Sequence, residues 1–367
     1  MKLALRRTLR AAAVIATVLV FGTGSAFAAT PVLERASAPR GGTAGVLKAV
    51  SMASTTKGWA VGSTGVSLSG TGVDRLLLSW NGRRWQRVPL EAIASSDESL
   101  RSVVAVSPTS AWAVGDQNPY GINPDLPVLL HYDGSAWSTV TGAFTTGRLW
   151  AVTASAESDV WALGTELEHY DGAAWTTVTT PVVANSTRAA ISTTSPTDAW
   201  LAGTQFTGSY SGNGQPLIEH WNGASWSVVT LPATTTDDRL MAIAARSASD
   251  VWAVGLSSGV PLTMHWDGST WLRITAAPTS GNGELDSVAV DASGTVWAVG
   301  HEDGVDSRGY AVWRPMAQRW TGTAWERVSG PAVGDFDAWL GGAGIAGGKV
   351  WAVGANQGTL IASAPTT

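Results

Sequence analysis

The sequence contains no cysteine, which excludes disulfide bonds and thiolate metal sites as sources of stability. Charged residues make up only 14% of the chain, a low share for a helical protein and an ordinary one for an all-β protein. Beyond the N-terminal region, no hydrophobic run is long enough to cross a membrane. A core built from the 44% of hydrophobic residues must therefore stabilise the fold by itself.

The N-terminal segment has the three parts of a secretory signal peptide. A basic start is followed by a short apolar run over residues 11–21 and by the small-residue pattern Ala26-Phe27-Ala28. We predict a signal peptide over residues 1–28, a mature domain over residues 29–367 and a secreted, extracellular protein. The general secretory route is favoured over the twin-arginine route, and an uncleaved N-terminal anchor is the alternative.

Cleavage would also change the charge of the protein. It removes Lys2, Arg6, Arg7 and Arg10 and takes the formal net charge from −5 to −9. A negative sign disfavours nucleic acid as a partner.

One short phrase, close to Val-Trp-Ala-Val-Gly, recurs seven times with a mean spacing of roughly 49 residues. Its tryptophans are Trp59, Trp112, Trp161, Trp200, Trp252, Trp297 and Trp351. An apolar strand precedes each copy, and a third strand ending in an aromatic residue, a tight Asn-Gly or Asp-Gly turn and a fourth strand follow it. Four short strands per unit are typical of a propeller blade. We therefore predict an all-β, seven-bladed β-propeller, with a six-bladed ring as the alternative.

The last unit lacks a fourth strand of its own, because the chain ends soon after Gly358-Thr359-Leu360-Ile361-Ala362. Residues 31–35 precede the first strand in the same order in which a fourth strand precedes the next unit. We predict that this N-terminal strand completes the last blade and so removes two exposed sheet edges.

Of the 20 tryptophans, 17 occupy repeat positions, and only Trp150, Trp313 and Trp339 do not. In the repeated strand, Trp and Val point to one side and Ala and Gly to the other. The bulky side of one blade is expected to pack on the small side of the next. The tryptophan content alone therefore does not indicate a carbohydrate site.

The repeats resemble those of secreted bacterial propellers of the kelch and galactose-oxidase-like group. The resemblance rests on the strand Val-Trp-Ala-Val-Gly and on segments such as Leu217 to Pro232. A single Gly stands where kelch repeats have a pair, and the Tyr position is often Trp. The resemblance implies the architecture and not an activity. The copper-oxidase branch of the group needs a cysteine, which this chain lacks.

Candidate ligand-binding residues are expected on the face that carries the connections between blades and between second and third strands, because function often resides on loops of a rigid scaffold. The long second-to-third connections span Asp116–Pro127, Thr204–Gln215 and His301–Pro315. Aromatics that no repeat rule requires, with arginines at first-strand entries, give the candidate set: Tyr120, Arg148, Trp150, Arg188, Phe206, Tyr210, Arg239, Tyr310 and Trp313. The alternative is that these aromatics pack onto the rim.

No metal or cofactor site is predicted. Four histidines share one repeat position, so they are spread around the ring and a structural role is expected: His131, His169, His220 and His265. His301 lies near Glu302, Asp303 and Asp306, which could hold a cation by oxygen ligands, although the spacing matches no EF-hand loop.

No catalytic residue is assigned, because no nucleophile, phosphate-binding or dinucleotide motif appears in a suitable context. Acidic residues near first-strand entries are interpreted as solvated turn charges: Glu98, Asp237, Asp238, Glu284, Asp286, Asp335 and Asp337.

The leading hypothesis is a non-catalytic, monomeric scaffold that binds a protein or an extracellular glycan. One alternative is a polysaccharide hydrolase or lyase with two carboxylates at the channel mouth. The other is a structural component of the cell envelope.

Overall fold

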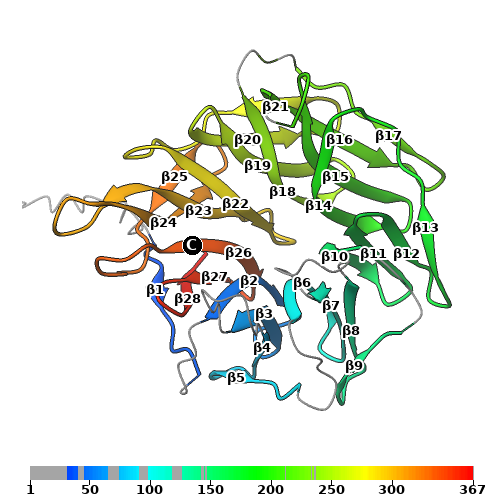
Figure 1. The fold of residues 1–367 in the computed structure, drawn as a ribbon, viewed down its shortest axis with the longest axis horizontal. Helices are drawn as coiled ribbons and strands as arrows, with labels where there is room; N and C mark the ends of the chain where they lie inside the picture. Colours follow the sequence, from blue (N-terminus) through cyan, green and yellow to red (C-terminus); the bar gives the residue numbers. More distant parts are fainter. Residues whose placement is uncertain are drawn as a thin grey trace, which may run out of the picture. The chain divides into compact units, whose positions relative to one another are not determined.

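Seven four-stranded antiparallel sheets form the blades of a β-propeller in the computed structural model of this chain (Figure 1). The structure describes residues 31–39, 45–64, 74–90, 98–117, 126–141, 144, 147–210, 212–232, 234 and 237–366. The predicted signal peptide lies outside these residues. Within the described part of the chain there is no helix, and so none that could span a membrane.

The strands of each blade run outward from the centre in chain order. Blades 1 to 3 are β2 (Gly45–Met52), β3 (Gly58–Thr64), β4 (Asp74–Trp80), β5 (Trp85–Arg87); β6 (Glu98–Ser107), β7 (Ser110–Gln117), β8 (Leu126–Tyr132), β9 (Trp137–Thr139); and β10 (Leu149–Ala156), β11 (Asp159–Gly164), β12 (Leu167–Tyr170), β13 (Trp175–Val178). Blades 4 and 5 are β14 (Ser186–Ser195), β15 (Asp198–Phe206), β16 (Gly214–Trp221), β17 (Trp226–Val228); and β18 (Asp238–Ser247), β19 (Asp250–Ser257), β20 (Val260–Trp266), β21 (Trp271–Ile274). Blade 6 is β22 (Gly283–Val290), β23 (Val296–Val305), β24 (Ala311–Trp320) and β25 (Trp325–Val328).

Blade 7 combines the two ends of the chain, as predicted. It contains β26 (Trp339–Ala346), β27 (Lys349–Ala355), β28 (Thr359–Pro365) and, outermost, β1 (Glu34–Arg35). Glu34 pairs with Ser363 and Arg35 with Ala362. Leu33, 1% exposed, joins the apolar cluster between blades 6 and 7. The seven-bladed prediction is confirmed and the six-bladed alternative is wrong.

The core is divided into seven apolar clusters, and each lies between two neighbouring blades. In the cluster between blades 1 and 2, Trp59 and Val61 pack against Ala111 and Ala113 of the next blade. The cluster formed by Trp351, Val353 and Ala60 closes the ring from blade 7 to blade 1 in the same way. This is the predicted packing of a bulky side on a small side.

The other repeated tryptophans extend these clusters outward. The aromatic that ends a third strand pairs with the Trp that opens the fourth, as Trp80 does with Trp85. Both rings contact the central Trp of the preceding blade, here Trp351, at centroid distances of 4.6 and 5.4 Å. Blade 7 ends in β1 and lacks this aromatic pair, and Leu33 takes its place beside Trp297.

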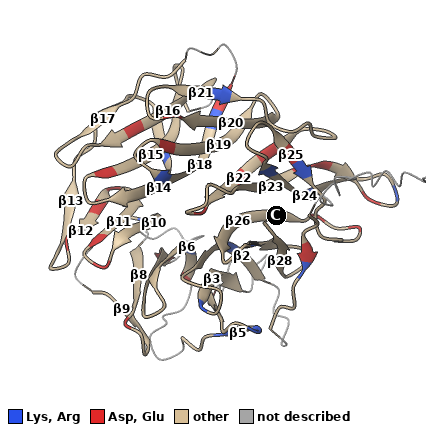
Figure 2. Cartoon of the chain, turned by 180° about the vertical axis from the view of Figure 1, so that it is seen from behind, with Lys and Arg blue, Asp and Glu red and all other residues tan. Residues whose placement is uncertain are grey.

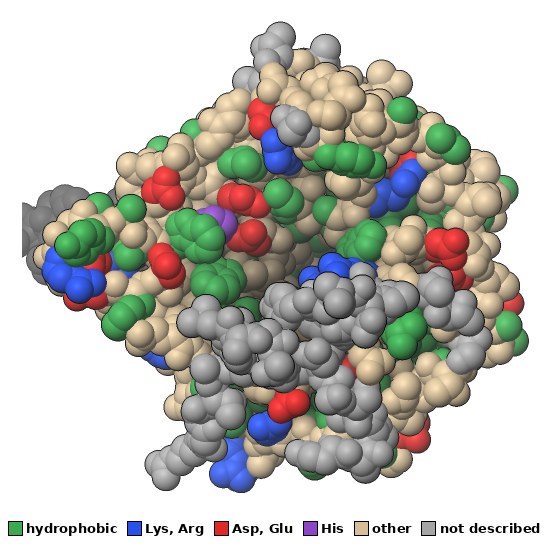
Figure 3. Space-filling view, in the orientation of Figure 1, with side chains coloured by type: hydrophobic (Ala, Val, Ile, Leu, Met, Phe, Trp, Pro, Cys, Tyr) green, Lys and Arg blue, Asp and Glu red, His purple; other side chains and the backbone are tan. Residues whose placement is uncertain are grey.

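Two faces of the ring differ in their connections. We call turn face the side with the first-to-second and third-to-fourth strand turns, such as residues 157–158 and 171–174. We call loop face the opposite side, with the blade-to-blade and second-to-third connections. Figure 3 shows a face with a hollow near its centre.

Candidate functional site

Every innermost strand carries a β-bulge at the same place in its pairing with the second strand. The residue before the bulge is a buried leucine in six blades, whereas the bulged residue is partly exposed in all seven. The bulged residues are Lys48, Arg101, Trp150, Ala189, Met241, Asp286 and Gly341. Because a bulge re-aims side chains, we assign this bulge ring to the wall of the channel mouth.

The bulge explains the glycine that ends each repeated phrase. A Cβ on Gly354 would overlap the carbonyl oxygen of Trp339, two residues before the bulged Gly341. The equivalent overlap occurs in the other six blades, for example between Gly62 and the carbonyl of Val46. The repeated Gly is thus required by the close approach of the bulged backbone.

One side of the bulge ring is basic. Arg101 forms an ion pair with Asp116, and its Nη2 lies 3.2 Å from Oδ2 of that buried carboxylate. Burial, with a smaller contribution from the positive charge of Arg101, lowers the pKa of Lys48 to about 8. The Lys48 amine is therefore easily neutralised in this position.

Blade 6 supplies an acidic side. Nδ1 of His301 lies 3.0 Å from Oδ2 of Asp286, and this hydrogen bond raises the pKa of His301. Burial raises the pKa of Glu284, and the negative charge of Asp286 adds to the effect. In Figure 3 acidic side chains and a histidine border the hollow on the β22–β24 side, and basic side chains border it elsewhere.

Aromatic rings continue the acidic side towards blade 7. Trp313 on β24 lies 4.9 Å from the His301 ring and 6.1 Å from the Trp339 ring, which it meets edge-on. The backbone of Trp313 is fixed, because its amide donates a hydrogen bond to Oδ1 of Asp337 at 2.8 Å. Its side chain nevertheless remains 47% exposed. A fixed and exposed indole is suited to contact a partner.

Phe206, Tyr210 and Arg239, three of the predicted candidates, form one cluster on blades 4 and 5. The Phe206 and Tyr210 rings are 5.7 Å apart, and the Arg239 guanidinium lies 5.3 Å from the centre of the Phe206 ring. Asp237 holds Arg239 by two hydrogen bonds of 3.1 and 3.0 Å. The bond to Arg239 is also the main reason why the pKa of Asp237 is lowered.

Trp150 and Arg188 lie together between blades 3 and 4, where both line a pocket of about 530 Å³. The indole Nε1 of Trp150 donates to the carbonyl oxygen of Arg188 at 3.0 Å. The Arg188 side chain bonds Glu219 at 2.5 and 2.8 Å and the carbonyl of Pro181 at 2.8 Å. The Arg188 guanidinium is therefore held by structural hydrogen bonds, whereas the Trp150 ring lines the pocket and can contact a ligand there.

The remaining candidates lie apart from these clusters. Arg148 is fixed at the blade 3 entry, where its backbone amide donates to Oγ1 of Thr165 at 3.2 Å. Tyr310 is at the tip of the β23–β24 hairpin, 66% exposed, with the Arg308 guanidinium 5.2 Å from its ring centre. Tyr120 lies outside the described residues.

The connection predicted over His301–Pro315 is largely strand and not loop. β23 and β24 stay paired from His301–Pro315 to Val305–Ala311, so only residues 306–310 turn. This pairing separates the suggested cation ligands: Glu302 pairs with Arg327, Asp303 accepts a bond from Asn282, and Asp306 pairs with Arg308. Among the described residues no group of three or more such ligands converges. The cation hypothesis for this segment is wrong.

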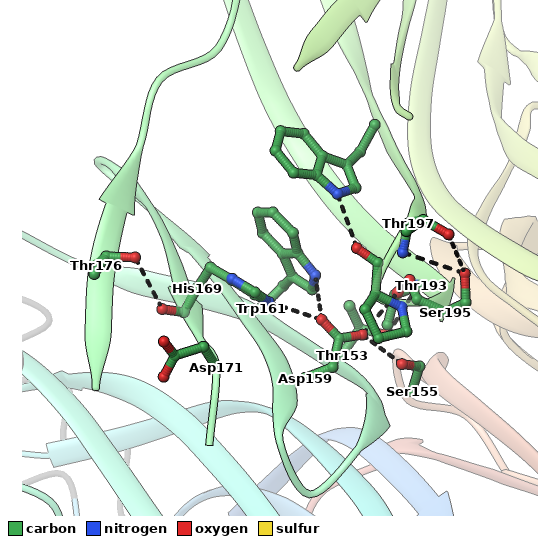
Figure 4. Close-up of polar contacts among 12 residues, drawn as sticks. Thr153, Ser155, Asp159, Trp161, His169, Asp171, Thr176, Thr193, Ser195 and Thr197 are labelled. Atoms are coloured by element: carbon green, nitrogen blue, oxygen red, sulfur yellow. Dashed lines mark hydrogen bonds and ion pairs between the residues drawn. The ribbon is translucent and has the colours of Figure 1, made fainter. Parts of the chain in front are cut away.

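The four repeated histidines have the predicted structural role. Each stacks on the central Trp of its own blade at 4.1 to 4.2 Å. In blade 3, Nε2 of His169 lies 2.7 Å from Oδ1 of Asp159, which also accepts from Nε1 of Trp161 at 3.2 Å (Figure 4). Burial by itself would raise the pKa of Asp159, but the bonds to His169 and Ser155 outweigh burial and lower it.

Two acidic residues interpreted as solvated turn charges are in fact buried. Glu98 is 6% exposed and pairs with Arg75, and Asp238 is 2% exposed and pairs with Arg273. The first ion pair joins β6 to β4 of the preceding blade, and the second joins β18 to the fourth strand β21 of the same blade, so these buried carboxylates are not solvated turn charges.

Sequence reasoning missed the bulge ring as a unit, and with it Lys48, Met241 and Gly341. A signal was present: in six units the bulged residue follows the leucine that is repeated in the first strand. Aligning the units on that leucine would have placed six of the seven bulged residues at one level.

Comparison with family models and with curated proteins gave no match. Solved structures do match in fold. A structure of YCF48 from Cyanidioschyzon merolae shares 16% identity with a TM-score of 0.56, covering 90% of this chain and 98% of that one. A structure described as YCF48 bound to D1 peptide shares 16% identity with a TM-score of 0.57, and the match covers 92% of this chain and 98% of that one. The WD40 propeller domain of Doa1 shares 13% identity with a TM-score of 0.58, and the match covers 90% of this chain and 96% of that one. At these identities the comparisons show the propeller fold alone.

Proposed function

We propose that this protein is a secreted, non-catalytic scaffold that binds a polypeptide partner across the channel mouth on the loop face. The observation that carries the proposal is the mixed character of the bulge ring. Lys48 and Arg101 come from blades 1 and 2, and Asp286 comes from blade 6 beside the exposed Trp313. A single polypeptide segment can present acidic, basic and apolar side chains together, and so can complement a surface that is basic on one side and acidic and aromatic on the other.

Two further observations support a role in binding. Arg239, Asp237 and Phe206 are pre-ordered by mutual contacts, which lowers the entropy lost on association. A similar propeller has been solved with a bound peptide, according to its description. The resemblance of the repeats to kelch propellers stays a hypothesis about their family.

The described fold is compatible with export. Cleavage after Ala28, as predicted, would leave β1 intact because β1 begins at Glu34. Expression with export, followed by N-terminal sequencing, tests this point. Sequencing should find Ala29 first, and a retained Met1 on exported protein would contradict it. We expect a monomer by light scattering.

The binding proposal is tested with two probe libraries: random peptides displayed on phage and a panel of purified polysaccharides. We expect the wild type to enrich peptides, and Asp286→Asn and Trp313→Ala to lose most of that enrichment. Leu272→Ala is the matched control, because Leu272 is also 47% exposed but lies on the outer strand β21. Enrichment that survives both loop-face substitutions would refute the proposed site. Binding of polysaccharides only would reassign the partner to the glycan class.

The hydrolase alternative draws on one observation, the raised pKa of Glu284 beside Asp286. However, both carboxylates come from one strand and do not face each other across a cleft, as paired glycosidase carboxylates do. Release of reducing sugar by the wild type but not by Glu284→Gln would favour the hydrolase. The pocket between blades 3 and 4 counts against a purely structural envelope component.

A further inference from the structure

The turn face carries a repeated device beside the central tryptophan in five of the seven blades. The device uses two positions: the residue two places before the Trp, and the third-strand residue paired with the Trp. Blades 3, 4 and 5 have Asp and His there, joined by bonds of 2.7, 2.8 and 2.7 Å. Blades 1 and 7 have Lys and Ser, with the ammonium over the Trp ring at 5.1 and 4.3 Å.

Blade 6 has Thr295 and Arg319 at these two positions. Blade 2 departs from both patterns in another way. It keeps the histidine, His131, which stacks on Trp112 at 4.1 Å, but has Ser110 where blades 3 to 5 have Asp. A serine side chain is too short to bridge to the imidazole as that carboxylate does. Ser110 is only 4% exposed and its Oγ has no hydrogen-bond partner, and within the described residues no hydrogen bond reaches the His131 ring. The device is therefore incomplete in this blade.

A pocket of about 510 Å³ opens at this incomplete device, between blades 2 and 3. Ser110, His131, Asp133, Glu157 and Tyr170 are among its lining residues. Seen from behind, acidic positions gather around β11 and β12 on this part of the ring (Figure 2). The described lining residues include two acidic residues and no lysine or arginine, so the pocket favours a cation.

The protonation of the lining points the same way. Bonds from the amide of Ala136 and from Ser135 hold the pKa of Asp133 at about 2, so its carboxylate is charged at neutral pH. Burial lowers the pKa of His131, which keeps the imidazole neutral and leaves one ring nitrogen as an acceptor.

The neighbouring groove shows which cation suits such a place. Between blades 1 and 2, the Lys57 ammonium lies 5.1 Å from the Trp59 ring centre and 4.9 Å from that of Tyr132, and 3.4 Å from the Tyr132 hydroxyl. Trp112 and Tyr170 form the equivalent pair one groove further, 5.5 Å apart. Ser110 stands where Lys57 would be, so the chain supplies no ammonium of its own in this groove.

We propose that the groove between blades 2 and 3 is a second binding site, which accepts a lysine side chain of a protein partner. The ammonium would donate to His131 and to Ser110, with Glu157 as the nearby counter-charge and the Tyr170 ring beside it. The site is on the turn face and does not depend on the loop-face function proposed above.

The experiment uses the full mature chain and capped amino acids as probes. Nα-acetyl-lysine N-methylamide is titrated while the imidazole carbon–proton NMR signals are followed, with the His131 signal assigned from His131→Gln. We expect a saturable shift of that signal. The Nε-acetylated probe, which lacks the charge, should give none. A capped aspartate that shifts the His131 signal at a lower concentration than the lysine probe would overturn the proposal, because the site would then prefer a carboxylate to an ammonium group.

Two substitutions make the test specific. Ser110→Asp rebuilds the Asp–His pair of blades 3 to 5, so the lysine probe should no longer bind while the thermal midpoint rises. Glu157→Gln removes the counter-charge and should weaken binding about tenfold. Leu272→Ala, on the outer strand of blade 5, is the control and should bind as the wild type does. Undiminished binding to folded Ser110→Asp, or no shift in the wild type, would refute the site. Loss of loop-face binding alone leaves this result unchanged.

Discussion

Replacing Gly354 by alanine tests the link between the repeated phrase and the bulge ring. The new Cβ would overlap the carbonyl oxygen of Trp339, and Gly354 cannot retreat because its strand β27 is paired with β26 on one side and β28 on the other. Relief therefore requires β26 to move away from β27 as a unit. Overpacking at a rigid site costs about 3 kcal/mol. That corresponds to roughly a hundredfold fall in the folding equilibrium constant.

Gly341→Ala is the matched control in the same blade. Its new Cβ would meet nothing closer than the carbonyl oxygen of Lys48 at 3.6 Å, an ordinary contact. Its stability should change by no more than ~0.5 kcal/mol. The assay is equilibrium unfolding in guanidinium followed by tryptophan fluorescence and by circular dichroism, with agreement of the two probes checked first. Similar midpoints for Gly354→Ala and Gly341→Ala would refute our account of the repeated glycine.

Three other changes test the packing. Asp159→Asn should cost ~2 kcal/mol at pH 7, because it weakens the charged bond to His169. The pKa of Asp159 is lowered in the fold, so its contribution is present above the unfolded value near 3.8 and is lost as pH falls through the folded value. The difference in free energy of unfolding between the two proteins should therefore stay constant from pH 7 to about pH 4 and shrink below that pH; a gap that does not shrink there would contradict the assignment. Ser192→Ala removes a 3.0 Å bond to the amide of Ala245 in the next blade and should lower the free energy of unfolding by ~1 kcal/mol, measured by the same denaturation. Leu33→Ala should cost about 3 kcal/mol because Leu33 is buried between blades 6 and 7, and an unchanged midpoint would show that β1 adds little.

The architecture was predictable because one strand encodes it. Trp59 and Val61 on one side, with Ala60 and Gly62 on the other, specify what each blade presents to its two neighbours. The missing fourth strand of the last unit likewise pointed to residues 31–35. These features depend only on the alternation of side chains in a strand, which can be read from the sequence.

The site was less predictable because it depends on register. Lys48 and Met241 look like ordinary strand residues until the bulge turns them to the channel mouth. The segment His301–Pro315 was expected to be a loop, although Glu302 and Gly304 alternate with His301 and Asp303 as they do in a strand. The carboxylates therefore separate to opposite sides. The pairing of His301 with Asp286 joins two strands, which no local pattern specifies.

The pairing of Glu34 with Ser363 joins residues 329 positions apart, and it has a kinetic consequence. Contacts of such long range slow folding, since a large loop must close before they form. During synthesis β1 emerges early, whereas its partner β28 is made only after the strands of the other blades. Six blades can assemble in chain order, but the ring closes only when β1 pairs with β28. A circular permutant opened between blades, with the present ends joined by a short linker, would turn that contact into a local hairpin and should lock sooner.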